Sequence, residues 1–197
     1  MNFLAHSLLS SDYDHWMVGN LVADLIKKKE VILLDQDIQQ GVYLHYEIDS
    51  FTDSHSLVAE ATQLLHATQG KYSPVATDLI WDLCLAKNWK LYSQVPLEDF
   101  INNVYNHLKN SEDKLEPKLV LRLNKLIDRD FLTMYSSPDT MKIICEKIHQ
   151  RTRFKSNLHL LMNDYSRLES KFNSIFLKFY PELEANIKVW KLKILSK

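Results

Sequence analysis

Residues 41–55 carry several side chains that can do acid–base or metal chemistry. His45, Asp49 and Asp53 follow one another at intervals of four residues, and His55 lies just beyond them. On an α-helix this spacing places an imidazole and two carboxylates along one face. Apolar residues between them predict that the helix is largely buried, and a buried charge has to be paired, hydrogen-bonded or bound to a cation. The stretch is therefore a candidate metal or catalytic site, with helix capping and salt bridges as the alternative explanation.

Further imidazole and carboxylate groups lie in the same half of the chain, at His6, Asp24, Asp78 and Asp82. Ligands of these two kinds suit Mn²⁺, Fe²⁺, Zn²⁺ or Mg²⁺ better than they suit soft metals. A cation bound in this way can activate water near neutral pH and neutralise a phosphoryl oxygen, so a helical site of mixed His and Asp points to phosphoester hydrolysis. Spacing alone also fits a structural role, because His–Asp pairs four residues apart are common.

The composition predicts an all-α fold. The chain has 197 residues, the length of one ordinary domain, and it contains only three glycines and five prolines. So few turn-forming residues argue against a many-stranded β-fold and against glycine-rich phosphate-binding loops. We expect a single domain over residues 1–197, built as a helical bundle of about seven to nine helices.

Hydrophobic periodicity, together with helix start and stop residues, places the expected helices along the chain. They cover about residues 14–28, 41–53, 57–68, 73–89, 96–110, 117–135 and 138–150, and a last helix begins near residue 156. Three lysines at 27–29 are expected to close the first helix, where they suit the negative end of the helix dipole. Pro181 is expected to break or kink the last helix.

Charge and cysteine usage limit the classes of partner and compartment. The formal net charge is −1, which predicts no general affinity for nucleic acid or for an anionic membrane. Cys84 and Cys145 are far apart in the sequence. We expect both to be small buried residues of a protein in a reducing compartment. No apolar stretch approaches the roughly 18 to 20 residues that span a bilayer, and the start of the chain lacks the basic region of a signal peptide. We expect a cytoplasmic protein.

The other histidines and the aromatic residues receive structural assignments. The remaining scattered histidines are expected to be single surface or core groups on different helices: His66, His107, His149 and His159. The aromatic residues at helical spacing are expected to form core rather than a cofactor site: Trp16, Trp81, Trp89 and the stripe at residues 172–179.

Four motifs occur in order along the chain: MNFLAH at the start, GNLVADLIK at 19–27, GVYLHYEIDSFTDSH at 41–55 and WDLCLAKNW at 81–89. Together with RTRF near Arg151 and FYPEL near Phe179, they closely resemble the acyl carrier protein phosphodiesterases. The resemblance runs over nearly the whole chain. It implies an all-α fold related to the HD-domain phosphohydrolases. It also implies hydrolysis of the phosphodiester that joins 4′-phosphopantetheine to a serine of holo-acyl carrier protein.

The resemblance also implies roles for individual residues. A divalent cation, typically Mn²⁺ with Fe²⁺ or Mg²⁺ as alternatives, would be held by four positions: His6, Asp24, His45 and Asp82. Asp49 or Asp53 would orient a ligand histidine or accept a proton. Basic residues would bind the acidic helix of a carrier protein and the phosphate, unless they are simply solvated: Lys27, Lys28, Lys71, Arg151 and Arg153.

The chain departs from the family pattern at three positions. Leu83 stands where the family has a histidine after Asp82, and Tyr46 stands where it usually has an arginine. Lys71 stands where relatives often have histidine or arginine. Its ammonium group is a point charge and cannot make the two parallel hydrogen bonds that an arginine guanidinium makes to a phosphate. Leucine cannot bind metal or move a proton. Three interpretations therefore stay open: a metal-dependent hydrolase, a carrier-protein-binding module that has lost turnover, and a purely structural helical domain.

Overall fold

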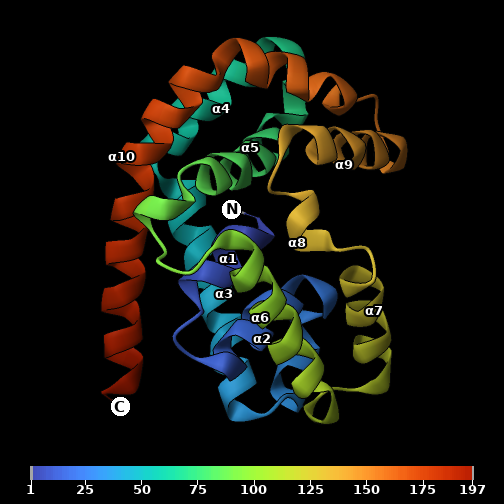
Figure 1. Cartoon of the computed structure of the whole chain (residues 1–197), viewed down its shortest axis with the longest axis vertical. Coiled ribbons are helices and arrows are strands. Elements are labelled where there is room, and N and C mark those ends of the chain that lie inside the picture. The colour runs from blue at the N-terminus through green and yellow to red at the C-terminus, as the bar shows by residue number, and fades with distance from the viewer. Residues whose placement is uncertain (1, 197) are drawn as a thin grey trace.

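The computed structural model describes residues 2–196, so Met1 and Lys197, the two ends of the predicted domain, lie outside the described residues. The fold is all-helical, as predicted (Figure 1). Its α-helices are α1 (Phe3–Leu9), α2 (Asp14–Val22), α3 (Gln36–Ser54), α4 (Ser56–Gln69), α5 (Ser73–Lys87), α6 (Leu97–Asn110), α7 (Pro117–Ile127), α8 (Phe131–Met134), α9 (Pro138–Arg151) and α10 (Leu161–Leu195). The short helices α1 and α8 raise their number above the expected seven to nine.

Two glycines let α2 and α3 cross with their backbones in contact. A Cβ atom added at Gly19 would overlap the carbonyl oxygen of Ile38, and one added at Gly41 would overlap the carbonyl oxygen of Trp16. Only glycine fits both positions, because the atoms in the way belong to backbone that cannot swing aside. The crossing brings the end of α2 against the middle of α3, where His45 lies.

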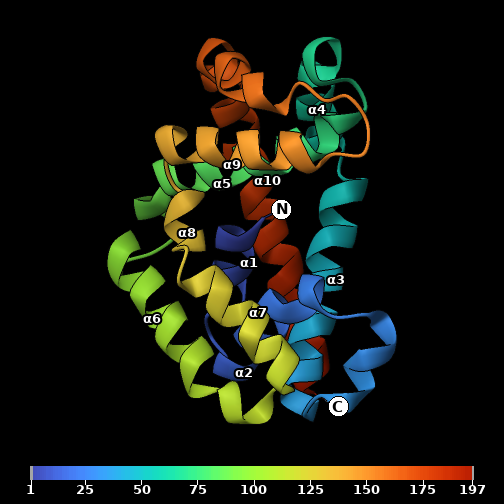
Figure 2. The same ribbon diagram turned by 90° about the vertical axis from the view of Figure 1, so that its right-hand side faces the viewer.

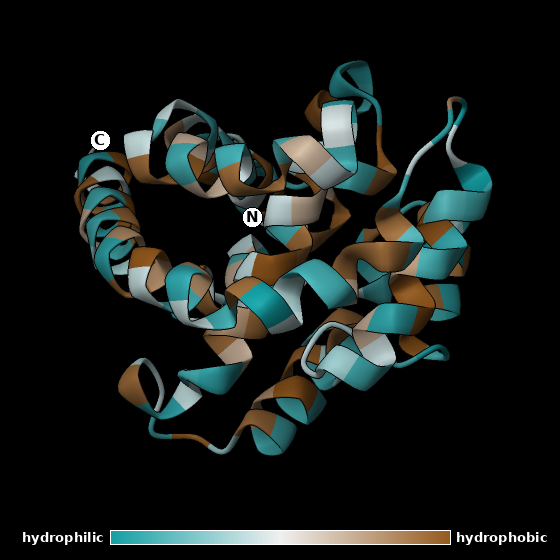
Figure 3. Ribbon diagram, turned by 90° about the horizontal axis from the view of Figure 1, so that it is seen from above, coloured by the Kyte–Doolittle hydropathy of each residue, from teal (hydrophilic) through white to brown (hydrophobic). Residues whose placement is uncertain are grey.

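Aromatic packing joins the long C-terminal helix to α5. The Trp81 ring packs against Phe172, Phe176 and Phe179 with centroids 5.7–6.4 Å apart, and all four side chains are fully buried. The core assignment of these residues is therefore confirmed, as is the burial of both cysteines. Figure 3 shows hydrophilic and hydrophobic residues alternating around the helices, as expected for helices buried on one side.

Three expected helix boundaries need correction. The helix expected over 14–28 ends at Val22 and continues as two 3₁₀ turns, η1 (Ala23–Leu25) and η2 (Lys28–Leu33), so the lysines do not close an α-helix. The helix expected over 117–135 is divided by Asp130, whose φ of 49° is left-handed. Pro181 does not break α10, which continues through it and changes direction along its length (Figure 1).

None of the helices within residues 2–196 combines the length and the apolar character that crossing a bilayer requires.

Candidate metal centre

Three elements bring two histidines and two aspartates together. His6 comes from α1, Asp24 from η1, and His45 and Asp49 from α3. The Nε2 atom of His45 lies 3.1 Å from Asp49 Oδ2 and 3.4 Å from Asp24 Oδ1, while the Nε2 atom of His6 lies 3.2 Å from Asp49 Oδ1. The two imidazole rings stack with centroids 4.4 Å apart. One nitrogen or oxygen atom from each of His6, His45 and Asp49 lies within 4.8 Å of the other two, which makes the three residues a candidate group for one metal ion.

Asn20 orients both imidazoles. Its side-chain nitrogen donates to the backbone oxygen of His6 at 2.9 Å, which leaves its Oδ1 atom to accept from His6 Nδ1 at 2.7 Å. The backbone oxygen of Asn20 accepts from His45 Nδ1 at 3.0 Å. Both rings therefore carry a proton on Nδ1 and turn Nε2 toward the carboxylates. Hydrogen bonds of this kind fix the tautomer and the ring orientation of metal-ligating histidines.

The electrostatics of the group favour a positive charge at its centre. Burial disfavours protonated His45, but hydrogen bonds with Asp24 and Asp49 outweigh burial and raise its pKa to about 9. The pKa of Asp24 is lowered, chiefly by its hydrogen bond with His45. Burial raises the pKa of Asp49, yet the two histidines more than offset burial and lower it overall. Burial lowers the pKa of His6. A proton on His45 fills the place that a bound cation can take.

The donor set and the space fit a small cation. The Nε2 atom of His6 is buried, and its nearest charged neighbour among the described residues is Asp49 Oδ1 at 3.2 Å. A hollow of about 10 Å³, near the size that one water needs, is lined by Asn2, Phe3, His6, Asn20, Leu21, Asp24 and His45. Imidazole nitrogen and carboxylate oxygen together suit Mn²⁺, Fe²⁺ or Zn²⁺.

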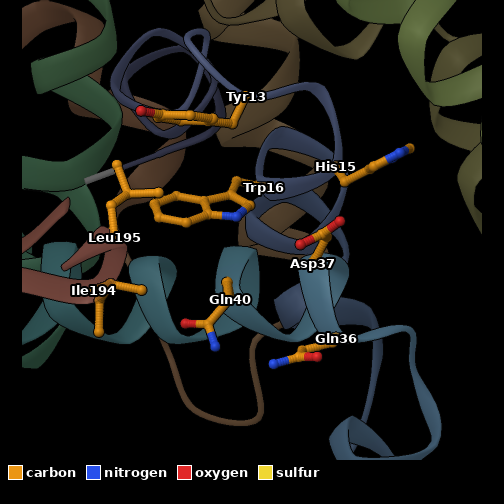
Figure 4. A pocket seen from close by; sticks show the side chains of 8 residues that line it. All are labelled: Tyr13, His15, Trp16, Gln36, Asp37, Gln40, Ile194 and Leu195. Carbon is orange, nitrogen blue, oxygen red and sulfur yellow. The ribbon is translucent and has the colours of Figure 1, made fainter. Parts of the chain in front are cut away.

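Larger hollows lie away from this group. One of about 420 Å³ is lined by Tyr13, His15, Trp16, Gln36, Asp37, Gln40, Ile194 and Leu195 (Figure 4). None of the predicted site residues lines it. Cavity size therefore does not locate the candidate site in this chain, whereas the convergence of ligand atoms does.

Two of the predicted acidic residues lie outside the converging group. The carboxylate of Asp82 accepts hydrogen bonds from the backbone amides of Leu4 and Ala5 at 3.0 and 3.3 Å. Burial raises the pKa of Asp82 to about 7, and those amides oppose the rise. Asp82 thus supports α1, the helix that carries His6. Asp53 is exposed on the last turn of α3, one turn beyond Asp49.

The structure also places the residues that depart from the family pattern. Leu83 is 2% exposed in the core, and the converging ligand atoms come from α1, η1 and α3 rather than from α5. The Tyr46 ring lies 6.0 Å from the His45 ring, and the Lys28 ammonium lies 5.6 Å from the Tyr46 centroid. Lys28 therefore supplies positive charge beside the position where the family usually has arginine.

The predicted basic residues form two separate surfaces. The near basic surface consists of the predicted Lys27 and Lys28 together with Lys29, all three exposed and following Asp24. The far basic surface consists of Lys71, Arg151 and Arg153. The Lys71 ammonium lies 3.2 Å and the Arg153 guanidinium 5.5 Å from the centroid of the exposed Phe154 ring. Helix α4, 14 residues and about 20 Å long, separates Lys71 from the end of α3.

Two features of the structure were not predicted. The role of Asn20 in orienting the two imidazoles was not predicted, and its position four residues before Asp24 was the only signal for it in the sequence. His149 and His159 were expected to be single groups, which is wrong. Their rings pack 4.1 Å apart at 49°, and His149 Nδ1 lies 2.8 Å from Ser156 Oγ.

The known proteins that the chain resembles are acyl carrier protein phosphodiesterases. The family model for acyl carrier protein phosphodiesterase matches residues 1–183. The chain is 28% identical to the acyl carrier protein phosphodiesterase of Pectobacterium atrosepticum, over 98% of this chain and 100% of that protein. It is 29% identical to that of Photorhabdus laumondii, over 92% of each chain. No solved structure matches the chain, so the relation to HD-domain phosphohydrolases stays a prediction.

Proposed function

The chain belongs to the acyl carrier protein phosphodiesterase family, and from this premise we propose that it hydrolyses the phosphodiester between 4′-phosphopantetheine and a serine of holo-acyl carrier protein. The products are apo-carrier protein and phosphopantetheine. The observation that carries the proposal is the convergence of His6, His45 and Asp49, with Asn20 orienting both imidazoles.

These residues fit a divalent cation, Mn²⁺ first and Fe²⁺ or Mg²⁺ as alternatives. His6, His45 and Asp49 would hold it. A cation bound there would supply Lewis-acid activation of water and would neutralise charge on the phosphate. Asn20 keeps both Nε2 lone pairs turned toward the cation by holding the Nδ1 protons.

The exposure of the four side chains gives the group a closed side and an open side. The histidine side chains are 4% and 7% exposed, that of Asp49 is 41% exposed and that of Asp24 is 65% exposed. Asp24 therefore lies on the side from which a substrate can approach. It is placed to complete the ligand set or to accept a proton from water, and Lys28 nearby meets the negative charge of the phosphate.

The test is a mass-spectrometric time course of holo-acyl carrier protein incubated with the protein and Mn²⁺. The wild-type protein and a His149→Ala control, whose histidine lies outside the centre, are expected to remove the phosphopantetheine mass. An Asp49→Asn variant is expected to leave it in place, because one of the converging ligands is weakened.

An unchanged substrate mass at wild-type protein levels comparable to substrate would contradict the proposal. If the carrier still bound, the alternative would be a carrier-protein-binding module without turnover. The departures at Leu83 and Tyr46 from the family pattern are the reason to keep that alternative in the test.

A further inference from the structure

Residues 27–33, called here the 27–33 segment, combine positive charge with exposed apolar side chains. Ile32 is 78% exposed and Leu33 is 73% exposed, the two highest values for large hydrophobic residues in the described part of the chain. They follow the three exposed lysines of the near basic surface. A single exposed apolar residue is ordinary, but two adjacent ones beside three cations form a surface suited to a partner with acidic and apolar groups.

The segment is an ordered turn. The backbone amide of Lys27 donates to Glu30 Oε2 at 2.8 Å, and the amide of Leu34 donates to the carbonyl oxygen of Val31 at 3.1 Å. Val31 is 5% exposed and belongs to the core. Because Val31 points inward on a short 3₁₀ turn, Ile32 and Leu33 are held out in solvent.

The segment borders the open side of the metal centre. It begins three residues after Asp24, and Lys28 reaches the Tyr46 ring, which contacts His45. Arg122 of helix α7 donates to the carbonyl oxygen of Leu25, two residues before the segment. Figure 2 shows where α7 runs in the fold. Arg122 adds a further cation to the same face.

The chemistry of the substrate selects this surface over the far basic surface. In a holo-carrier protein the phosphate is bonded directly to the serine side chain, so the scissile bond lies at the carrier surface and not at the end of the prosthetic group. The carrier surface must therefore touch the residues around Asp24 during the reaction. Lys71 is separated from the end of α3 by the length of α4, about 20 Å, which is too far for a first contact around the serine.

From these observations we infer that the 27–33 segment is the surface on which the carrier protein docks. Lys27, Lys28 and Lys29 pair with acidic residues of the carrier, and Ile32 and Leu33 contact apolar groups beside the modified serine. The inference rests on the proposed function for the identity of the partner. It goes beyond that function because it assigns binding to apolar side chains that no catalytic role requires.

The test measures binding without turnover. The dissociation constant for holo-acyl carrier protein is measured in EDTA for the wild type, for an Ile32→Ser/Leu33→Ser double variant and for a Val189→Ser/Leu192→Ser control. The control replaces two exposed apolar residues on α10. The 27–33 variant is expected to bind about tenfold more weakly, the loss typical of an interface anchor, and the control to match the wild type. A Lys28→Glu variant is expected to weaken binding and to reduce its salt dependence.

Several outcomes would overturn the inference. One is an unchanged dissociation constant in the 27–33 variants, and another is a wild-type protein that does not bind the carrier. A third is loss of binding only in a Lys71→Ala/Arg151→Ala/Arg153→Ala variant. Vesicles of phosphatidylglycerol test the lipid alternative: vesicle binding that Ile32→Ser/Leu33→Ser abolishes, with carrier binding unchanged, would assign the segment to a membrane. Carrier binding through the segment without hydrolysis would support the docking surface while contradicting the proposed function.

Discussion

Two pairs of packed histidines lie in different parts of this molecule and differ in their neighbours. The rings of His6 and His45 are 4.4 Å apart, and those of His149 and His159 are 4.1 Å apart. The first pair has two carboxylates and Asn20 around it. The second has the Ser156 hydroxyl, and neither of its histidines forms an ion pair with another described residue.

The difference shows what makes an imidazole pair a candidate cation site. Close packing of two rings occurs in both regions, so ring contact carries no functional information. In the first pair, carboxylates raise the pKa of His45 to about 9 against the opposing effect of burial, so that position favours positive charge. Carboxylates and a shared orienting residue, not histidines alone, distinguish the two regions.

Removing one histidine from each pair should produce the largest contrast. His45→Ala deletes a ligand held between two carboxylates, and we expect activity and bound Mn²⁺ to fall by more than about a hundredfold, beyond the usual loss for a supporting residue. His149→Ala should leave both unchanged. Turnover of holo-carrier protein and metal analysis of the purified protein check this. Equal losses in His45→Ala and His149→Ala would contradict a functional difference between the two histidine pairs.

Breaking the α2–α3 crossing should disrupt the first pair through the fold. Gly41→Ala forces a methyl group into the Trp16 carbonyl, and we expect the free energy of unfolding to fall by about 3 kcal/mol or more. Urea denaturation measures the loss. Gly70→Ala is a useful comparison, because open space surrounds that position and only its positive φ of 54° opposes a side chain. A smaller loss at Gly41 than at Gly70 would contradict the packing argument.

Asn20 offers a more selective way to weaken the first pair. Asn20→Ala removes the side-chain partner of His6 but keeps the backbone oxygen that accepts from His45. We expect Mn²⁺ affinity to fall about 10- to 100-fold, as for other residues that orient metal ligands. Calorimetric titration of the metal-free variant with Mn²⁺ gives the affinity. Unchanged affinity would show that the orientation of His6 does not depend on Asn20.

The smallest predicted effect concerns Asp82, whose carboxylate supports the helix of His6. Its folded-state pKa of about 7 exceeds the ordinary value of 3.8, so between these values the folded protein holds a proton that the unfolded chain has released. The Asp82 contribution to the free energy of unfolding therefore falls as pH rises from about 4 to about 7, and then stays constant.

Asp82→Asn should remove this contribution. Urea denaturation of the metal-free protein between about pH 5 and pH 7 should give a shallower decline in the variant than in the wild type. Parallel slopes in the two proteins would contradict the assigned protonation. In this range Asp49 and Asp24, whose pKa values are lowered, stay ionised in both states.

Local spacing made part of the site predictable from sequence. His45 and Asp49 are four residues apart on one helix, and their contact follows from helix geometry. His6 and Asp24 were candidates by residue type alone, and only the family resemblance implied that they join His45, because their approach to it depends on how α1, α2 and α3 pack. Asp82 was placed among the metal ligands, although the packing of α5 against α1 aims its carboxylate at backbone amides instead.

The fold, too, was predictable where it follows from local sequence pattern and not where it depends on the folded chain. Scarce glycine and apolar periodicity were enough to predict an all-α protein. They did not reveal the left-handed Asp130 that divides α7 from α8, because neither glycine nor proline marks that position. They also did not show that Lys28 and Lys29 begin a 3₁₀ turn with Lys27 at its N-cap, since the chain leaves the α-helix at Val22 without a stop residue.

The contact of two backbones at Gly19 and Gly41 fixes the distance between α2 and α3 at the site. Side chains in a core can change size and repack, but a contact between main chains has no adjustable part. The separation of Asn20 from His45 is thus insulated from substitutions elsewhere in the core. If the centre binds a cation, a change in its metal preference would therefore require exchange of the side chains around it, because the backbone contact fixes the spacing of the two helices.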